Sequence, residues 1–312
     1  MMKTAILGSG AMGCLYGGML AEAGNDVVLV DVWKEHMDAV NGSGLKIEDS
    51  NGERTVKNIR GVTDPTAAGP VDLVIVFVKA TATEQAMRGA LCLVGENTTV
   101  LTLQNGLGNV EKICGVVGAP RVVAGTTGHG STLVGPGKIR HAGVGETVIG
   151  APNTSESSDG RVESLASFFG GAKLTTRISK NVMGLIWTKL VVNVAINALT
   201  AVTGLKNGRL VDFPETAELM KLSVEEACAV AKAKGIRFDV DDPLEHARNI
   251  ARLTAANRSS MLQDVMSKRP TEVSVINGAI VEEGKKLGIP TPVNAVLTNL
   301  VLTKQKTYEE IA

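Results

Sequence analysis

Residues 3–31 of the chain read KTAILGSGAMGCLYGGMLAEAGNDVVLVD, and this stretch decides the fold class. Residues 3–7 are a short apolar run that predicts a buried strand. Residues 11–23 are typical of a helix, which a Gly-Asn pair ends. A second apolar run follows over residues 27–30. A strand, a helix and a second strand in this order predict the start of a parallel sheet.

The turn between the first strand and the helix has the pattern G-x-G-x-x-G. Its first glycine permits a tight turn, its second lets the backbone approach a pyrophosphate, and its third allows close packing of helix on strand. The helix N-terminus offers unsatisfied N–H groups and the positive end of the helix dipole. We therefore expect a dinucleotide to bind here; the alternative is a purely structural turn. The six residues are Gly8, Ser9, Gly10, Ala11, Met12 and Gly13.

An acidic residue, Asp31, ends the second strand and is followed by Val32. A carboxylate at this place accepts hydrogen bonds from the ribose hydroxyls of NAD, whereas a nearby arginine suits the 2′-phosphate of NADP. The nearest positive charge is Lys34. These residues favour NAD(H), unless Asp31 is only a solvated aspartate at a strand end.

Strand and helix signals continue to alternate through the first half of the chain. The clearest strand is VDLVIVFV, because a nearly continuous β-branched run is typical of a parallel strand covered on both faces. We expect an α/β domain with a doubly wound parallel sheet, extended by antiparallel strands. The strands are expected at 45–47, 71–78 and 99–103, a helix at 83–94, and the antiparallel strands within 122–150.

Beyond residue 178 the strand signals stop, and an all-helical domain is expected. The length of 312 residues also favours two domains, at about 100–200 residues for each. We place a dinucleotide-binding domain at residues 1–178 and a helical catalytic domain at residues 179–312. Helices are expected at 181–202, 215–234, 243–255, 271–287 and 292–306.

Composition argues against several classes of partner. The 32 basic and 32 acidic residues cancel, which disfavours nucleic acid, and 3% aromatics leave few side chains for base stacking. No run approaches the roughly 18 apolar residues that span a bilayer. The four cysteines and four histidines are scattered, so we expect reduced thiols, a cytoplasmic protein and no metal site. A homodimer is the default assembly.

One predicted helix has a polar stripe. Lys189, Asn193 and Asn197 recur every four residues in an apolar stretch and so share one face. Such groups are costly to bury unless they pair or face a polar cleft. Burial lowers the pKa of a lysine and makes it a plausible proton donor. Because hydride delivered to a ketone leaves an alkoxide that needs a proton, the stripe predicts a carbonyl reductase; a helix-packing network is the alternative.

Taken together, these motifs resemble the ketopantoate reductase (2-dehydropantoate 2-reductase) family over essentially the whole chain. The resemblance implies a Rossmann-type domain followed by a helical domain, and reduction of the C2 ketone of ketopantoate to D-pantoate in pantothenate biosynthesis. Besides the glycine loop and the lysine helix, the matching motifs are VFVKA at 76–80, LQNGLGN at 103–109, GTTGHG at 125–130, PGKIRHAGVGET at 136–147 and SSMLQDVMSKRPTEVSVINGAI at 259–280.

The resemblance also implies roles for residues in the second half. Lys189 is similar to the family's general acid, and Glu272 to its active-site glutamate. Asn193, Asn197 and Ser260 match positions that bind the substrate. From the sequence alone, Glu272 is equally a favourable acid in the first turn of a helix, and Ser260 a helix cap.

Lys79 and Asn105 match positions that contact cofactor and substrate. Both follow apolar strands, so both should lie at the carboxyl end of the sheet, where such sheets bind ligands. An ordinary solvated lysine is the alternative for Lys79. His129 and His141 fall within matching motifs, where we expect a structural role.

The cofactor is where the chain departs from the family. The resemblance implies NADP(H), with a basic residue just after the second strand, but this chain has Asp31 and Val32 there. That pattern is similar to an NAD-using branch that includes D-mandelate dehydrogenases. Two alternatives to a ketopantoate reductase therefore stay open: an NAD-dependent D-2-hydroxyacid dehydrogenase for other C3-branched 2-oxo acids, and a non-catalytic dinucleotide sensor, which should have lost the polar stripe.

Overall fold

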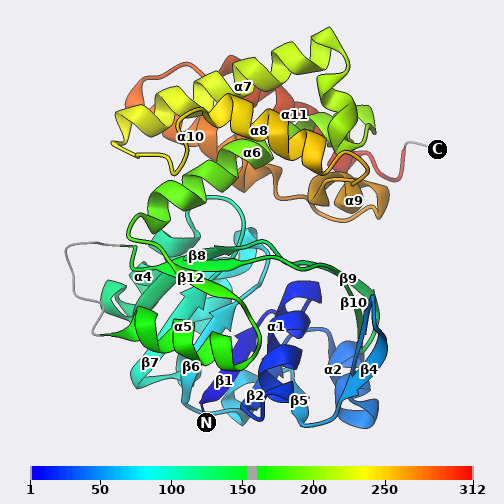
Figure 1. The fold of residues 1–312 in the computed structure, drawn as a ribbon, viewed down its shortest axis with the longest axis vertical. Coiled ribbons are helices and arrows are strands. Elements are labelled where there is room, and N and C mark those ends of the chain that lie inside the picture. Colours follow the sequence, from blue (N-terminus) through cyan, green and yellow to red (C-terminus); the bar gives the residue numbers. More distant parts are fainter. Residues whose placement is uncertain (1, 153–159, 311–312) are drawn as a thin grey trace. The chain divides into compact units, whose positions relative to one another are not determined.

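The computed structural model describes residues 2–152 and 160–310 of the chain (Figure 1). The chain divides into two compact units. Unit 1 comprises Met1–Gln104 and Asn109–Val182, and unit 2 comprises Asn105–Gly108 and Met183–Ala312. The division thus falls four residues beyond residue 178, and a short segment from the first half of the chain belongs to the helical unit.

Unit 1 is built on an eight-stranded sheet in the order β12-β11-β8-β7-β6-β1-β2-β5. The strands from β5 to β8 are all parallel, which confirms the doubly wound sheet. The chain adds strands on one side of β1 and then on the other, so the order reverses between β1 and β6, where open sheets bind ligands. The bounds are β1 Lys3–Leu7, β2 Asp26–Val30, β5 Ile59–Val62, β6 Val71–Val76, β7 Val94–Thr102, β8 Val122–Thr127, β11 Thr147–Gly150 and β12 Thr176–Ile178.

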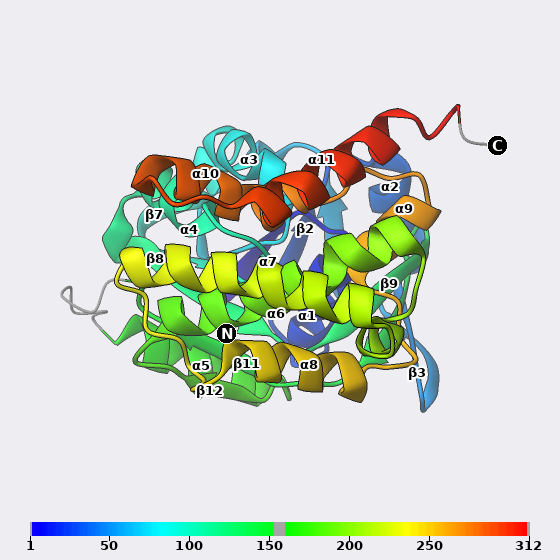
Figure 2. The ribbon, with the colours of Figure 1, turned by 90° about the horizontal axis from the view of Figure 1, so that it is seen from above.

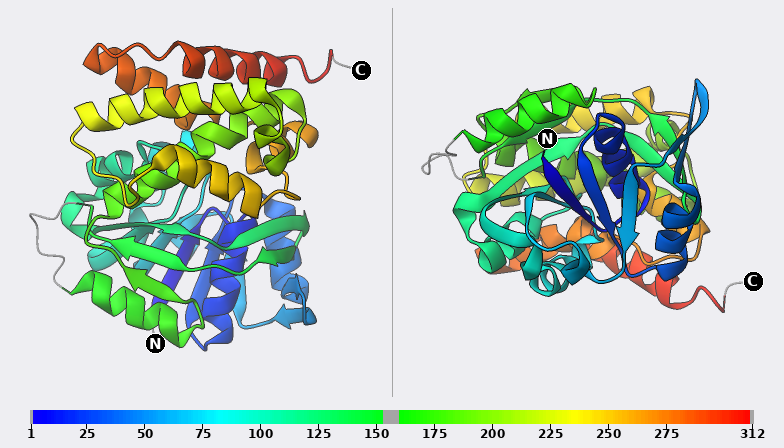
Figure 3. Two further views of the ribbon diagram at one scale, coloured as in Figure 1. Left: turned by 45° about the horizontal axis from the view of Figure 1, so that its top comes forward. Right: turned by 90° about the horizontal axis from the view of Figure 1, so that it is seen from below.

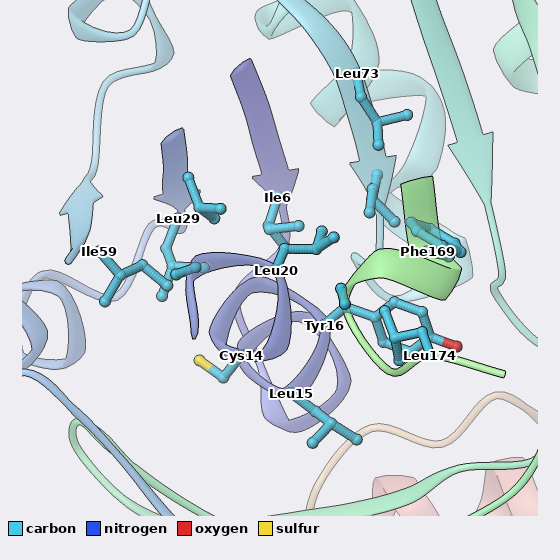
Figure 4. Close-up of a cluster of buried hydrophobic side chains, with 14 of the residues drawn as sticks. Ile6, Cys14, Leu15, Tyr16, Leu20, Leu29, Ile59, Leu73, Phe169 and Leu174 are labelled. Carbon is cyan, nitrogen blue, oxygen red and sulfur yellow. The ribbon is translucent and has the colours of Figure 1, made fainter. Parts of the chain in front are cut away.

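Both faces of this sheet are buried. Ile6 and Leu29 belong to one apolar cluster, with Tyr16 of α1 and Phe169 of α5, as Figure 4 shows. Val28, one residue before Leu29, belongs to a second cluster, because successive strand residues point to opposite faces. The helices of unit 1 are α1 Ala11–Glu22, α2 Lys34–Ser43, α3 Thr83–Gly89, α4 Asn109–Val117 and α5 Arg161–Gly171.

The antiparallel extension is confirmed but is shorter than expected. Within residues 122–150, β8 pairs in parallel with β7, and only β11 is antiparallel to β8. The strands between them leave the sheet and join a separate four-stranded sheet, β4-β3-β10-β9. The chain crosses itself there: a Cβ on Gly145 would lie 2.5 Å from the carbonyl carbon of Gly128. The bounds are β3 Leu45–Asp49, β4 Gly52–Val56, β9 Gly130–Gly135 and β10 Lys138–Gly143.

The described part of unit 2 is helical, as expected. Helix α7 contacts α8, α10 and α11, and Figure 2 shows it running between them. The helix expected at 271–287 begins only at Asn277, because Ile276 has φ −108° and ψ −93°, outside the helical region. A single 3-10 turn, Val273–Val275, stands in its place. The helices are α6 Val182–Thr203, α7 Pro214–Ala233, α8 Pro243–Leu253, α9 Ser260–Met266, α10 Asn277–Leu287 and α11 Pro292–Lys306.

Helix α6 corrects the expectation that no segment is apolar enough to span a bilayer. This 22-residue helix satisfies that criterion by length and composition, since its most apolar 18-residue window has a mean hydropathy of 1.7. However, 72% of its most apolar window is buried within the protein, as in the core helix of a soluble protein. Trp187, Val191 and Val194 of α6 are all buried in the apolar core of unit 2. Figure 3 shows two further views of the ribbon, in which α6 is one of the green segments.

Candidate functional site

The three glycines of the loop after β1 occupy three different environments. Gly8 has φ +94°, and a Cβ there would lie 2.4 Å from the backbone nitrogen of Val78. A Cβ on Gly13 would lie 2.1 Å from the carbonyl oxygen of Gly8, so α1 packs against the loop too closely for any side chain. A Cβ on Gly10 would meet nothing within 4 Å. The loop therefore has a tight turn, a close helix contact and one open position, which is the arrangement a pyrophosphate requires.

The N-terminus of α1 is suited to an anion. Gly10 is its N-cap and provides no side-chain hydrogen bond, and the first turn has no acidic residue. Ala11 and Met12 are half-buried, whereas Ser9 is fully buried. The Ser9 hydroxyl oxygen lies 3.3 Å from the carbonyl oxygens of Ile6 and Val30, so its side chain points into the protein. The side chain of Ser9 is therefore directed away from the open side of the loop.

Asp31 is more than a solvated residue at a strand end. Its Oδ2 accepts a hydrogen bond from the backbone N–H of Ser9 at 2.8 Å, and its Oδ1 accepts one from Trp33 at 3.0 Å. The carboxylate keeps further lone pairs for a ligand. Val32 is 94% exposed, and the exposed Lys34 is paired with Asp38 at 2.6 Å. Asp31 is thus followed by an exposed apolar residue, and the lysine nearest to it in the sequence is already paired with a carboxylate.

The loops that follow β6 and β7 are tied together by a residue that the sequence did not single out. Gln104 donates from Nε2 to the carbonyl oxygen of Val78 at 2.6 Å and to Oγ1 of Thr83 at 2.9 Å. Lys79, next to Val78, is exposed after the end of β6, as expected. The glutamine lies within the LQNGLGN motif, but nothing in its spacing indicates the partner across the sheet.

Asn105 begins the four-residue segment that belongs to unit 2. Within this segment Leu107 donates its backbone N–H to the carbonyl oxygen of Val275 at 3.0 Å. Gly106 has φ +82°, and a Cβ there would lie 2.6 Å from the same oxygen, so only glycine fits. Asn105 is half-buried and follows the last residue of β7 by three residues along the chain.

The polar stripe lies on α6. Burial lowers the pKa of Lys189 to about 8, and the nearby carboxylate of Glu272 acts in the opposite direction. Asn197 is 5% exposed, and Asn193 is half-buried. Across residues 2–152 and 160–310, no side-chain hydrogen bond joins either amide to another group. Within the described residues these two amides are therefore not part of a side-chain hydrogen-bond network of the helix packing.

Glu272 and Ser260 lie in the segment where the sequence was least informative. Glu272 is half-buried and precedes the 3-10 turn, so it is not in the first turn of a long helix. Its carboxylate is electrostatically coupled to Lys189. Ser260 is exposed and does not cap α9; the cap is Ser259, whose Oγ accepts from Leu262 N–H at 3.1 Å.

The two histidines of the matching motifs form a pair. Nδ1 of His129 lies 3.1 Å from Nε2 of His141, and the ring of Tyr16 meets His129 edge-on at 6.0 Å between ring centroids. This packing supports the structural role that we expected. Among the described residues, no three His, Cys, Asp or Glu side chains are grouped as metal ligands would be.

Comparisons with known proteins cover nearly the whole chain. Models described as ketopantoate reductase PanE/ApbA and its C-terminal part match residues 4–154 and 181–305. A 2-dehydropantoate 2-reductase of Halobacterium salinarum is 38% identical over 98% of this chain and 99% of its own. A PanE/ApbA family ketopantoate reductase from Ralstonia eutropha JMP134 has a TM-score of 0.91 at 36% identity, covering 99% and 100% of the two chains. A D-mandelate dehydrogenase with NADH and anilino(oxo)acetate has a TM-score of 0.93 at 30% identity, with the same coverage.

Proposed function

We propose that this chain, which belongs to the ketopantoate reductase family, reduces the C2 ketone of ketopantoate to D-pantoate. The single observation that carries the proposal is Lys189, whose burial lowers its pKa to about 8 beside the carboxylate of Glu272. A lysine with such a pKa is mostly protonated at neutral pH and yet gives up its proton readily. The names of the full-length relatives support the substrate.

In this mechanism a residue of α6 donates the proton that the reaction requires. A nicotinamide dinucleotide bound at the glycine loop supplies the hydride. Lys189 donates a proton to the oxygen of the C2 alkoxide as it forms. Glu272 favours the charged form of Lys189 before the reaction. The amides of Asn193 and Asn197 bind the substrate's oxygens.

Two further residues complete the substrate and cofactor contacts. Ser260 is exposed at the first position of α9, so its hydroxyl is available to the substrate rather than to the helix end. Asn105 and Lys79 follow β7 and β6 and contact cofactor and substrate from the carboxyl end of the sheet.

For the cofactor, NADH is proposed over the NADP(H) that the family resemblance implies. A 2′-phosphate would meet Asp31 and the exposed Val32, where no cation other than the paired Lys34 is near in sequence. Charge repulsion from the carboxylate disfavours such a phosphate, whereas ribose hydroxyls can donate to it. The structure of D-mandelate dehydrogenase with NADH supports this preference.

One alternative function is favoured by a specific observation. The D-mandelate dehydrogenase complex has a TM-score of 0.93 to this chain, which makes an NAD-dependent D-2-hydroxyacid dehydrogenase for other C3-branched 2-oxo acids the second candidate. A non-catalytic sensor is disfavoured, because a protein that only binds dinucleotide has no use for the buried Lys189.

Initial rates with a panel of 2-oxo acids test these functions. Ketopantoate, phenylglyoxylate and 2-oxoisovalerate are each measured with NADH and with NADPH. We expect the highest kcat/KM for ketopantoate with NADH. A value for phenylglyoxylate higher by about tenfold or more would replace the proposal with the second candidate. Absence of turnover by a protein that binds NADH would indicate the sensor.

We also propose that the enzyme is a cytoplasmic homodimer. It acts on a small molecule and has neither nucleic acid nor a membrane as a partner. Exposed apolar side chains on α11, Val296 at 58% and Leu300 at 48%, support a covered helical face. Sedimentation equilibrium of the parent and of Val296→Glu tests the dimer. A parent that sediments as a monomer would contradict it.

A further inference from the structure

His36 is a fully buried residue of α2 that connects three segments of unit 1. Its Nε2 lies 2.9 Å from the carbonyl oxygen of Ser9 in the glycine loop. Its Nδ1 accepts a hydrogen bond at 2.8 Å from the backbone N–H of Gly137, in the turn between β9 and β10. Because a carbonyl only accepts and a backbone N–H only donates, the ring is neutral with its proton on Nε2. Burial lowers the pKa of His36, which favours the same neutral form.

The Ser9 peptide groups are therefore held from both sides. Asp31 accepts from the N–H of Ser9 at 2.8 Å. His36 donates to its carbonyl oxygen, and the thiol of Cys14 donates to the same oxygen at 3.0 Å. A carbonyl oxygen has two lone pairs, so it accommodates both donors. The orientation of this one residue is fixed by three side chains from α1, α2 and the end of β2.

Fixing the carbonyl of Ser9 also fixes the N–H of Gly10. The peptide bond between them is planar and trans, so its C=O and N–H point in opposite directions. With the oxygen directed inward at His36, the N–H of Gly10 is directed away from it. Gly10 is also the loop position at which an added Cβ would meet nothing within 4 Å. The donor thus faces the open side of the loop, where a phosphate oxygen would accept from it.

We propose that His36 is a positioning residue for dinucleotide binding, which aims the N–H of Gly10 at the pyrophosphate by holding the carbonyl of Ser9. The inference rests on the proposed function only in taking a dinucleotide as the ligand. The ring of Trp33 stacks on His36 at 5.1 Å between centroids and 17° between planes, which keeps the imidazole in this orientation.

Two amide substitutions separate the two hydrogen bonds of the ring. In His36→Gln the side-chain nitrogen takes the place of Nε2 and keeps a donor toward Ser9. In His36→Asn the side-chain oxygen takes the place of Nδ1 and keeps only the acceptor for Gly137. Calorimetric titration of the full chain with NADH and with ADP-ribose gives the Kd for each. We expect His36→Asn to raise both values about tenfold, and His36→Gln to raise them by no more than about threefold.

A role limited to anchoring the β9–β10 turn predicts the opposite order, with the asparagine variant binding normally and the glutamine variant weakened. That order, or parent-like Kd values in both folded variants, would overturn the inference. At saturating NADH, kcat should change by less than about twofold, because the loop does not contact the reacting carbonyl. ¹⁵N NMR of the ligand-free protein should show the proton of His36 on Nε2; a proton on Nδ1 would overturn the inference without any ligand.

The second donor to the same oxygen provides a test if neither His36 variant folds. Cys14→Ser keeps a donor toward Ser9 and Cys14→Ala removes it, so the alanine variant should bind ADP-ribose about threefold more weakly than the serine variant. Equal affinities would contradict the proposed role of the Ser9 carbonyl. A protein that binds ADP-ribose normally but does not reduce ketopantoate would contradict the proposed function and leave the proposed role of His36 intact.

Discussion

The glycine loop of unit 1 and the polar stripe of unit 2 are prepared for their ligands in opposite ways. In the loop, the geometry depends on side chains that are missing: a Cβ would collide at Gly8 and Gly13 and would enter open space at Gly10. In the stripe, the chemistry depends on side chains that an apolar helix would otherwise exclude. The cost of burying them is visible in the pKa of Lys189, lowered to about 8. We therefore expect the glycine loop to lose ligand binding when atoms are added to it. The polar stripe should lose its function when side-chain atoms are removed.

Removing the amine of the stripe should have the largest effect. We expect Lys189→Ala to lower kcat about 100-fold or more, because the alkoxide loses its proton donor. Steady-state rates with ketopantoate and NADH measure this effect. Lys232→Ala, which removes an exposed lysine of α7, is the matched control and should keep the parental rate. A change confined to KM would instead make Lys189 a binding residue.

Adding one methyl group to the loop should separate binding from folding. Gly10→Ala should leave the free energy of unfolding within about 0.5 kcal/mol but weaken NADH binding about tenfold, because its Cβ occupies the space the pyrophosphate approaches. Gly13→Ala should instead destabilise the fold by at least about 1–3 kcal/mol, since its Cβ lies 2.1 Å from the oxygen of Gly8. Thermal unfolding and calorimetric titration measure the pair. Parental NADH affinity in Gly10→Ala would show that the ligand does not approach this position.

A smaller effect is expected where a side chain assists the backbone site. Asp31→Ala should weaken the binding of both cofactors, because the N–H of Ser9 loses its acceptor. It should also reduce the preference for NADH over NADPH about tenfold. The ratio of kcat/KM values with the two cofactors gives this preference. Lys34→Ala, which removes the cation paired with Asp38, should leave the ratio unchanged. An unchanged ratio in Asp31→Ala would show that another group selects the cofactor.

The difference between the two regions also explains what could be predicted from the sequence. The fold class and the loop were predictable, because glycine spacing and strand periodicity report local backbone geometry directly. The stripe could be predicted as a pattern on one helix face, but the proximity of Lys189 to Glu272 could not. That property depends on segments 75 residues or more away along the chain.

Three features escaped prediction for identifiable physical reasons. The prediction places the start of one helix at residue 271 instead of Asn277, because the apolar periodicity of the sequence continues through the break at Ile276. Ser260 was considered as a cap, although the neighbouring Ser259 performs that role; helix starts are ambiguous where two serines are adjacent. His36 gave no signal, since its partners Ser9 and Gly137 are backbone groups 27 and 101 residues away.

The pH dependence of the reaction in both directions tests the central claim most directly. Reduction requires protonated Lys189, and oxidation of D-pantoate requires the neutral amine. With a pKa of about 8, kcat/KM for reduction should fall as the pH rises past 8, and that for oxidation should rise through the same region. In Glu272→Gln, which lacks the carboxylate that raises this pKa, both breakpoints should move to lower pH. Profiles that are flat near pH 8, or that fall together in both directions, would contradict Lys189 as the proton donor.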